Sequence, residues 1–252
     1  MTTAARAGTA AGTGTVAGTG TVAGPRRAAD GPGAAAGDVG AAAARMRELG
    51  GGLGRRDGVR VFAGVYLSVT DEIGRRVAAG EFADPEAAAT LAALFAGRFV
   101  DAVRARRPPA CWRPLLRMRA HPGLHPLQFA LAGVNAHIGH DLPLAVVDTC
   151  LRTGCEPSGL EADFDRVGAV LGRIEARVRE ELMPGPDLLE AAEPLTHLAG
   201  TWSLARARDA AWASAGLLWT LRSAPRAYAE CERRLDGAVA LVSRFLLTPV
   251  GG

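Results

Sequence analysis

The stretch that decides the fold is LQFALAGVNAHIGHDLP, residues 127–143. Residues 127–141 are apolar on nearly all sides, which is typical of a helix buried in the middle of a bundle. His137 and Asp141 are four positions apart, so they lie one turn apart on that helix. Because burying an unpaired polar group costs roughly 2–7 kcal/mol, this pair is expected either to find partners or to serve a function.

Helical periodicity extends outward from this stretch in both directions. Residues 59–79 carry apolar side chains at the i, i+3, i+4, i+7 spacing, and Asp84-Pro85-Glu86 supplies an N-cap, a first-turn proline and an acidic first turn. No sustained alternation of apolar and polar residues indicates a sheet. The sequence therefore predicts an all-α, single-domain bundle of about six to eight helices. The expected helical ranges are 59–79, 84–106, 111–119, 127–141, 144–151, 164–183, 194–222 and 226–247.

The N-terminal part has a different composition. The hexapeptide AGTGTV occurs twice, at 11–16 and 17–22, within a stretch rich in Gly, Ala and Pro. Such a stretch has almost no large side chain to bury. We therefore expect residues 1–44 to be a disordered tail and residues 45–252 to form the helical domain. Since the tail contains no continuous apolar run, a secretory signal or membrane span is not expected, and the predicted location is cytoplasmic.

Charge and cysteine content narrow the classes of partner. The 252 residues include 29 Lys+Arg and 26 Asp+Glu, a net charge of +3, and the arginines are spread over many segments. Phosphate binding needs clustered positive charge, so no nucleic-acid partner is expected. The four cysteines show no CxxC spacing. Cys150 and Cys155 could form a disulfide, but small apolar side chains in a reducing compartment are the preferred interpretation.

Several segments resemble a family of uncharacterised helical proteins found largely in actinobacteria and described as a domain of unknown function. The resemblance covers residues 59–222. It implies an all-helical fold and no particular activity, and it transfers best to Asn135, His137 and Asp141. The segments that carry it are YLSVT (66–70), LFAGRF (94–99), Trp112, PLQFALAGVNAHI (126–138), DLP (141–143) and ARARDAAW (205–212).

Three interpretations of the polar stretch stay open at this point. In the first, Asp141 only orients His137 while Asn135 satisfies a neighbouring backbone group. Alternatively, His137 and Asp141, with His140 added, can ligate a divalent metal such as zinc or iron. In the third interpretation, His137 and Asp141 act without metal as an acid/base or binding pair, positioned by Asn135.

Further side chains are candidates for a substrate pocket. Tyr66 lies on the buried stripe of its helix and needs a partner for its hydroxyl, which could be found near His137. Trp212 belongs to a set of tryptophans spaced by nearly whole turns, and Arg206 lies close by. Together these suggest walls for a flat or apolar ligand. His121 and His125 fall in a turn and are expected to be exposed or to cap a helix.

The resulting hypothesis is a small-molecule enzyme with a buried His/Asp site on a central helix, metal-assisted or not. The alternative is a non-catalytic ligand-binding or interaction protein in which the His/Asp pair is structural.

Overall fold

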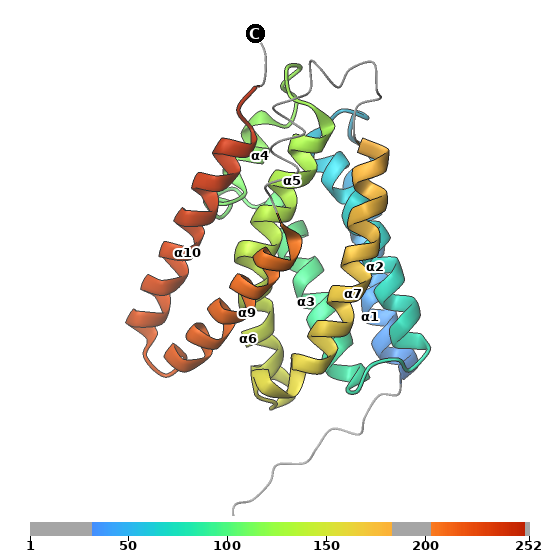
Figure 1. Ribbon diagram of the computed structural model, residues 1–252, viewed down its shortest axis with the longest axis vertical. Coiled ribbons are helices and arrows are strands. Elements are labelled where there is room, and N and C mark those ends of the chain that lie inside the picture. The colour runs from blue at the N-terminus through green and yellow to red at the C-terminus, as the bar shows by residue number, and fades with distance from the viewer. Residues whose placement is uncertain (1–31, 183–202, 250–252) are drawn as a thin grey trace, which may run out of the picture.

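The computed structural model describes residues 32–182 and 203–249, and these residues form helices and connecting turns (Figure 1). No strand occurs among them, which confirms the all-α prediction. The first nine residues of the range 194–222 lie outside the described part. The helices are α1 (Pro32–Gly51), α2 (Gly58–Ala78), α3 (Pro85–Arg104), α4 (Arg113–Met118), α5 (Pro126–Ala136), the π-helical segment η1 (His137–Asp141), α6 (Leu142–Thr153), α7 (Pro157–Leu182), α9 (Leu204–Leu221) and α10 (Pro225–Leu246).

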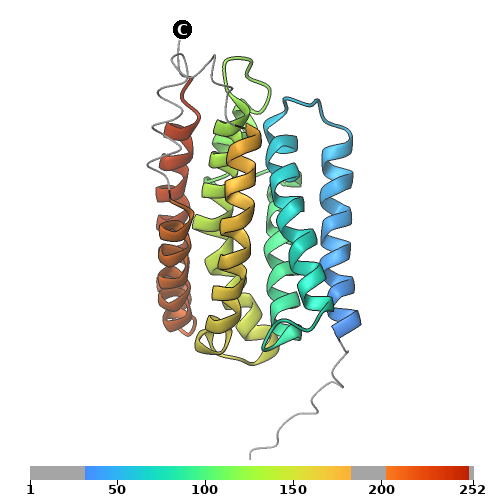
Figure 2. The same cartoon turned by 45° about the vertical axis from the view of Figure 1, so that its right-hand side comes forward.

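The long helices run roughly parallel or antiparallel to one another (Figure 2). Helices α5, α6 and α7 stand between the α9–α10 pair on one side and α2 and α3 on the other, with α1 outermost. The continuous run from α5 through η1 to α6 contacts α2, α3, α9 and α10, so the predicted central position of this segment is confirmed. Any side chain on its inward faces is therefore shielded from solvent.

The central run changes from α-helix to π-helix just before Pro143. The N–H of Leu142 donates to the carbonyl of His137, five residues back, where an α-helix would use the fourth. A proline clashes with the carbonyl four residues before it, so the wider turn accommodates Pro143 without ending the helix. His137, His140 and Asp141 all lie within this π turn.

Helix starts follow the capping signals of the sequence. The side chain of Asp84 accepts a hydrogen bond from the N–H of Ala87 and caps α3, as predicted. His125 caps α5 in a capping box with Gln128, and His121 is exposed in the preceding turn. The expectation that these two histidines are exposed or helix-capping is confirmed. Each such cap satisfies backbone donors that would otherwise lack partners.

The first helix begins inside residues 1–44, the stretch expected to be a disordered tail. Residues 1–31 lie outside the described part, but α1 begins at Pro32, twelve residues before the end of the expected tail. Val39, Ala42 and Ala43 are almost completely buried in this helix, which packs on α2 and α3. Met46 of the same helix is completely buried as well. Residues 32–44 thus begin a helix that packs on its neighbours, although their side chains are small.

The described cysteines are free thiols. The Sγ atoms of Cys150 and Cys155 lie 3.4 Å apart, so the two thiols are in contact without a bond. Among the described residues, no helix is long and apolar enough to cross a membrane.

The packing of α1 gives a first prediction. Val39→Ala removes two methyl groups from a fully buried position and should lower the free energy of unfolding by about 2 kcal/mol. Asp38→Ala, at the adjacent exposed position, should change it by less than about 0.5 kcal/mol. Urea denaturation of the two variants measures the difference. Equal stability of both variants would show that α1 is not part of the core.

Candidate functional site

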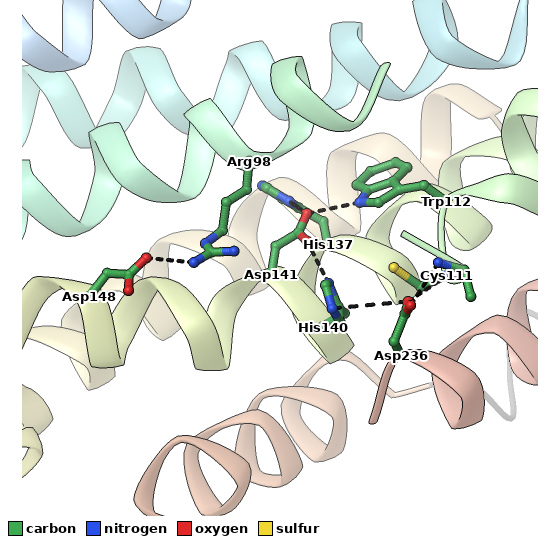
Figure 3. A network of polar contacts seen from close by, with 9 residues as sticks. Arg98, Cys111, Trp112, His137, His140, Asp141, Asp148 and Asp236 are labelled. Carbon is green, nitrogen blue, oxygen red and sulfur yellow. Dashed lines mark hydrogen bonds and ion pairs between the residues drawn. The ribbon is translucent and has the colours of Figure 1, made fainter. Parts of the chain in front are cut away.

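The centre of the site is the carboxylate of Asp141, which is 2% exposed and accepts three hydrogen bonds (Figure 3). One oxygen, Oδ2, lies 2.9 Å from His137 Nδ1 and accepts the indole N–H of Trp112 at 3.0 Å. The other, Oδ1, lies 2.8 Å from His140 Nδ1. Burial by itself raises the pKa of Asp141, but the hydrogen bonds from His137 and His140 outweigh it and hold that pKa below its ordinary value. Asp141 is therefore a buried anion.

The ionised carboxylate fixes the tautomers of both histidines. A carboxylate only accepts hydrogen bonds, so each Nδ1 must carry the proton. Burial lowers the pKa of His137, an effect that the hydrogen bond to Asp141 opposes only in part. His137 is thus a neutral imidazole, with a proton on Nδ1 and a free electron pair on Nε2.

His137 Nε2 is a buried acceptor for which the described residues supply no hydrogen-bond partner. The ring is 2% exposed and stacks on Phe95 at a centroid distance of 3.6 Å, while Tyr66 meets it edge-on at 4.4 Å. Phe62 and Trp112 complete the aromatic surroundings. An acceptor enclosed in this way costs free energy unless another molecule supplies a donor.

A largely apolar cavity of about 140 Å³ adjoins His137. Its walls come from α2, α3, α5, η1, α6, α7 and α9, and its polar wall residues include Tyr66 and Arg208. Burial, followed by the negative charge of Asp141, raises the pKa of the Tyr66 phenol well above its ordinary value. The guanidinium of Arg208 lies over the ring of Phe164 at 4.3 Å and donates to the carbonyl of that residue, but its buried Nε finds no partner in the described part of the chain.

A second polar cluster lies on the other side of Asp141. His140 Nε2 faces Asp236 Oδ1 at 4.0 Å, and the carboxylate of Asp236 accepts the backbone N–H groups of Ala110 and Cys111 at 2.8 Å each. Burial and the charges of Asp141 and Asp236 raise the pKa of the Cys111 thiol far above its ordinary value. Cys111, His140 and Asp236 come from three distant parts of the chain and meet here (Figure 3).

Arg98 borders the site from α3. It forms an ion pair with Asp148 and lies beside His137, where its charge adds to the lowering of the pKa of His137 (Figure 3). Its buried Nε has no hydrogen-bond partner among residues 32–182 and 203–249.

The structure brings some of the expected site residues together and separates others. Tyr66 contacts His137 and lines the cavity, as the sequence suggested. Asn135 turns away: its amide donates to the carbonyl of Val239 and to the hydroxyl of Ser243, at 3.1 and 3.0 Å, which fastens α5 to α10. Trp212 is half-buried against Phe164 outside the cavity wall.

The observed geometry differs from two further expectations. Arg206 is exposed and does not line the cavity, whereas Arg208, two positions further on, does. The expected ligand set of His137, His140 and Asp141 is joined by hydrogen bonds, because Asp141 accepts from both rings. Only His140 belongs to a described group whose ligand atoms converge well enough for a metal ion, and its companions are Cys111 and Asp236.

Sequence reasoning did not assign Cys111, Trp112, Asp236, Arg98 or Arg208 to the site. Trp112 was recognised only as an apolar helix residue and as part of the family resemblance. A usable signal was present nonetheless: an indole in a buried position needs an acceptor for its N–H, and Asp141 is a buried acceptor.

Comparison with known proteins identifies a family for the chain but no individual relative. The family described as "Family of unknown function (DUF5995)" matches residues 39–249. The match starts within α1, and it confirms that the chain belongs to an uncharacterised family. No curated protein and no solved structure matches the chain.

The three hydrogen bonds of Asp141 lead to a second prediction. In Asp141→Asn, the charge is lost and the amide NH₂ group faces one of the three donors, so that donor loses its acceptor or, where it is a histidine, has to change tautomer. The free energy of unfolding should fall by about 1–3 kcal/mol. Asp101→Asn, which neutralises an exposed carboxylate without a described partner, is the control and should change little. An unchanged melting temperature for Asp141→Asn would contradict the hydrogen-bond assignment.

The lowered pKa of His137 leads to a third prediction. In the unfolded chain, a histidine takes up a proton near pH 6.5, while in the fold His137 resists it. The stability that the neutral ring provides is complete above that pH and is lost as the pH falls toward the folded-state pKa, by at most about 1.4 kcal/mol per pH unit. His137→Phe keeps an aromatic ring but cannot titrate. From pH 7.5 to pH 5, the free energy of unfolding of wild type should fall relative to that of the variant; a difference between the two that does not change with pH would be inconsistent with a buried neutral His137.

Proposed function

We propose that this chain, which belongs to the DUF5995 family of unknown function, binds a small, largely apolar molecule in the cavity beside His137. The ligand donates a hydrogen bond to His137 Nε2 from a hydroxyl or N–H group. Asp141 keeps the imidazole in the tautomer that can accept this bond.

The observation that carries this proposal is the unpartnered Nε2 of a fully buried histidine on the wall of a cavity. A histidine retained only for packing would have both nitrogens satisfied or be replaced by an apolar ring at lower cost. Here one nitrogen is held by Asp141 at 2.9 Å and the other is left with a free electron pair. That arrangement suits the recognition of a donor group.

The cavity walls define the rest of the ligand. Apolar cavities of about 150 Å³ stay dry and take up molecules of the size of benzene. At about 140 Å³, the cavity beside His137 is of this class. Arg208 Nε on α9 is a donor that no described residue satisfies, so an acceptor oxygen on the ligand would also find a partner. The ligand class is thus a compact apolar body that carries a donor, with room for an oxygen acceptor.

Catalysis by the same pair is the second candidate. The hydrogen bond between Asp141 and His137 Nδ1 is the arrangement that lets a histidine act as general base through Nε2. In that mechanism, His137 Nε2 takes a proton from the ligand and Asp141 stabilises the resulting imidazolium. The lowered pKa of His137 weakens it as a base, and Asn135 points toward α10, so binding is better supported than turnover.

The test compares two probes of nearly equal size, phenol and toluene. Only phenol has a donor, and a net hydrogen bond of about 0.5–1.5 kcal/mol corresponds to roughly 2- to 12-fold in affinity. Calorimetric titration should show that wild type binds phenol more tightly than toluene. His137→Leu should retain toluene binding and lose the preference for phenol.

A cavity-filling pair of variants controls for location. Ala92→Phe places a ring in the cavity and should abolish binding of both probes, whereas Ala93→Phe, at the next position and off the cavity wall, should not. Absence of saturable binding in wild type, or equal affinity for the two probes, would refute the proposal. Native mass spectrometry of the purified chain then identifies the ligand that the cell provides.

A further inference from the structure

We infer that Cys111, His140 and Asp236 form a binding site for a divalent metal ion of the zinc class. The three residues lie before α4, in η1 and in α10, and one ligand atom from each lies within 4.8 Å of the others. None of the three lines the cavity, so this site is separate from the proposed ligand site.

The donor set matches the chemistry of zinc. Thiolate sulfur, imidazole nitrogen and carboxylate oxygen are the three ligand types that Zn²⁺ uses in proteins. Three protein ligands leave the fourth tetrahedral position to water, the arrangement of zinc sites that act on substrates. Hard cations such as Mg²⁺ and Ca²⁺ prefer oxygen ligands throughout and fit this set poorly.

The supporting hydrogen bonds already hold two of the ligands in place. His140 presents Nε2 to the cluster because its Nδ1 is held by Asp141 at 2.8 Å, which is the carboxylate–histidine pairing found behind many metal ligands. Asp236 is held by two backbone N–H groups, each at 2.8 Å. Ligands about 2.0–2.3 Å from a tetrahedral ion lie about 3.5 Å from one another, so side-chain shifts of about one ångström close the site.

The local charge also favours a cation. Two carboxylates, Asp141 and Asp236, lie in this mostly buried region, and within the described residues neither forms an ion pair with an arginine. A dication offsets this negative charge. When the ion binds, the S–H bond of Cys111 breaks, its proton goes to solvent and a sulfur–metal bond forms. Asp236, whose side chain is 20% exposed, gives the ion access from solvent.

The experiment is a titration of the full, chelator-treated chain with Co²⁺, a spectroscopic substitute for Zn²⁺. We expect one ion per chain, a sulfur-to-cobalt charge-transfer band in the near ultraviolet, d–d bands of four-coordinate intensity, and displacement of the cobalt by Zn²⁺. Cys111→Ser should lose the charge-transfer band, and Asp236→Asn should weaken binding at least tenfold. Cys150→Ser is the matched control, because it removes a buried thiol outside the cluster, and it should bind as wild type does.

Several results would overturn the inference. These are failure of wild type to bind one Co²⁺ with a sulfur band, survival of that band in Cys111→Ser, and loss of the band in Cys150→Ser. Circular dichroism of each variant shows whether it is folded, and the wild-type titration decides the question even where a variant is not. The phenol and toluene titrations do not involve these residues, so each proposal can fail without the other.

Discussion

The buried carboxylate of Asp141 is the constraint on which the centre of this structure depends. An ionised group with 2% exposure is tolerated only where hydrogen bonds replace its hydration. Three donors, two from η1 and one from the turn before α4, do so here, and each must approach from a fixed direction. The packing of the segment before α4 against η1 is therefore set by a directional polar contact as well as by apolar burial.

The π turn positions two donors of the Asp141 carboxylate, and the carboxylate stabilises the π turn. Pro143 prevents an ordinary α-helical turn, and within the wider turn that replaces it the rings of His137 and His140 both reach the carboxylate of Asp141. With two donors supplied from within the turn, the carboxylate in turn stabilises this less favourable backbone geometry. A π segment at a cluster of polar side chains is a common feature of functional sites.

Much of the fold could be predicted because its determinants are local. The cap at Asp84, the proline that follows it and the apolar stripe of α2 each act within one or two turns, and the observed helix bounds lie within two residues of the expected ones there. The start of α1 could not be predicted in this way. Val39 and its alanine neighbours are buried because α2 and α3 lie against them, and composition does not reveal that contact.

The same distinction between local determinants and tertiary contacts applies to the candidate site. His137 and Asp141 could be paired from sequence since a helix brings positions four apart onto one face. Trp112, Cys111 and Asp236 could not, because the first is 29 positions from Asp141 and the last is separated from Cys111 by 125. Only the tertiary fold joins them. Arg206 and Arg208 illustrate a finer limit: two positions along a helix rotate a side chain by slightly more than a half-turn, so Arg206 faces solvent while Arg208 lines the cavity.

The two oxygens of Asp141 connect two different environments. Oδ2 holds the histidine that borders the apolar cavity, and Oδ1 holds the histidine that belongs to the Cys111 cluster. Each hydrogen bond orients one Nε2 away from the carboxylate. The single charge of Asp141 therefore fixes which nitrogen is the acceptor in His137 and in His140. A cation at His140 withdraws electron density from that ring and strengthens its Nδ1–H as a donor, which draws the carboxylate toward His140. His137 then loses part of its share of the same charge, and its Nε2 becomes a weaker acceptor. A structural salt bridge would connect two residues and end there; a carboxylate shared between two histidines makes the cavity and the cluster parts of one polar network.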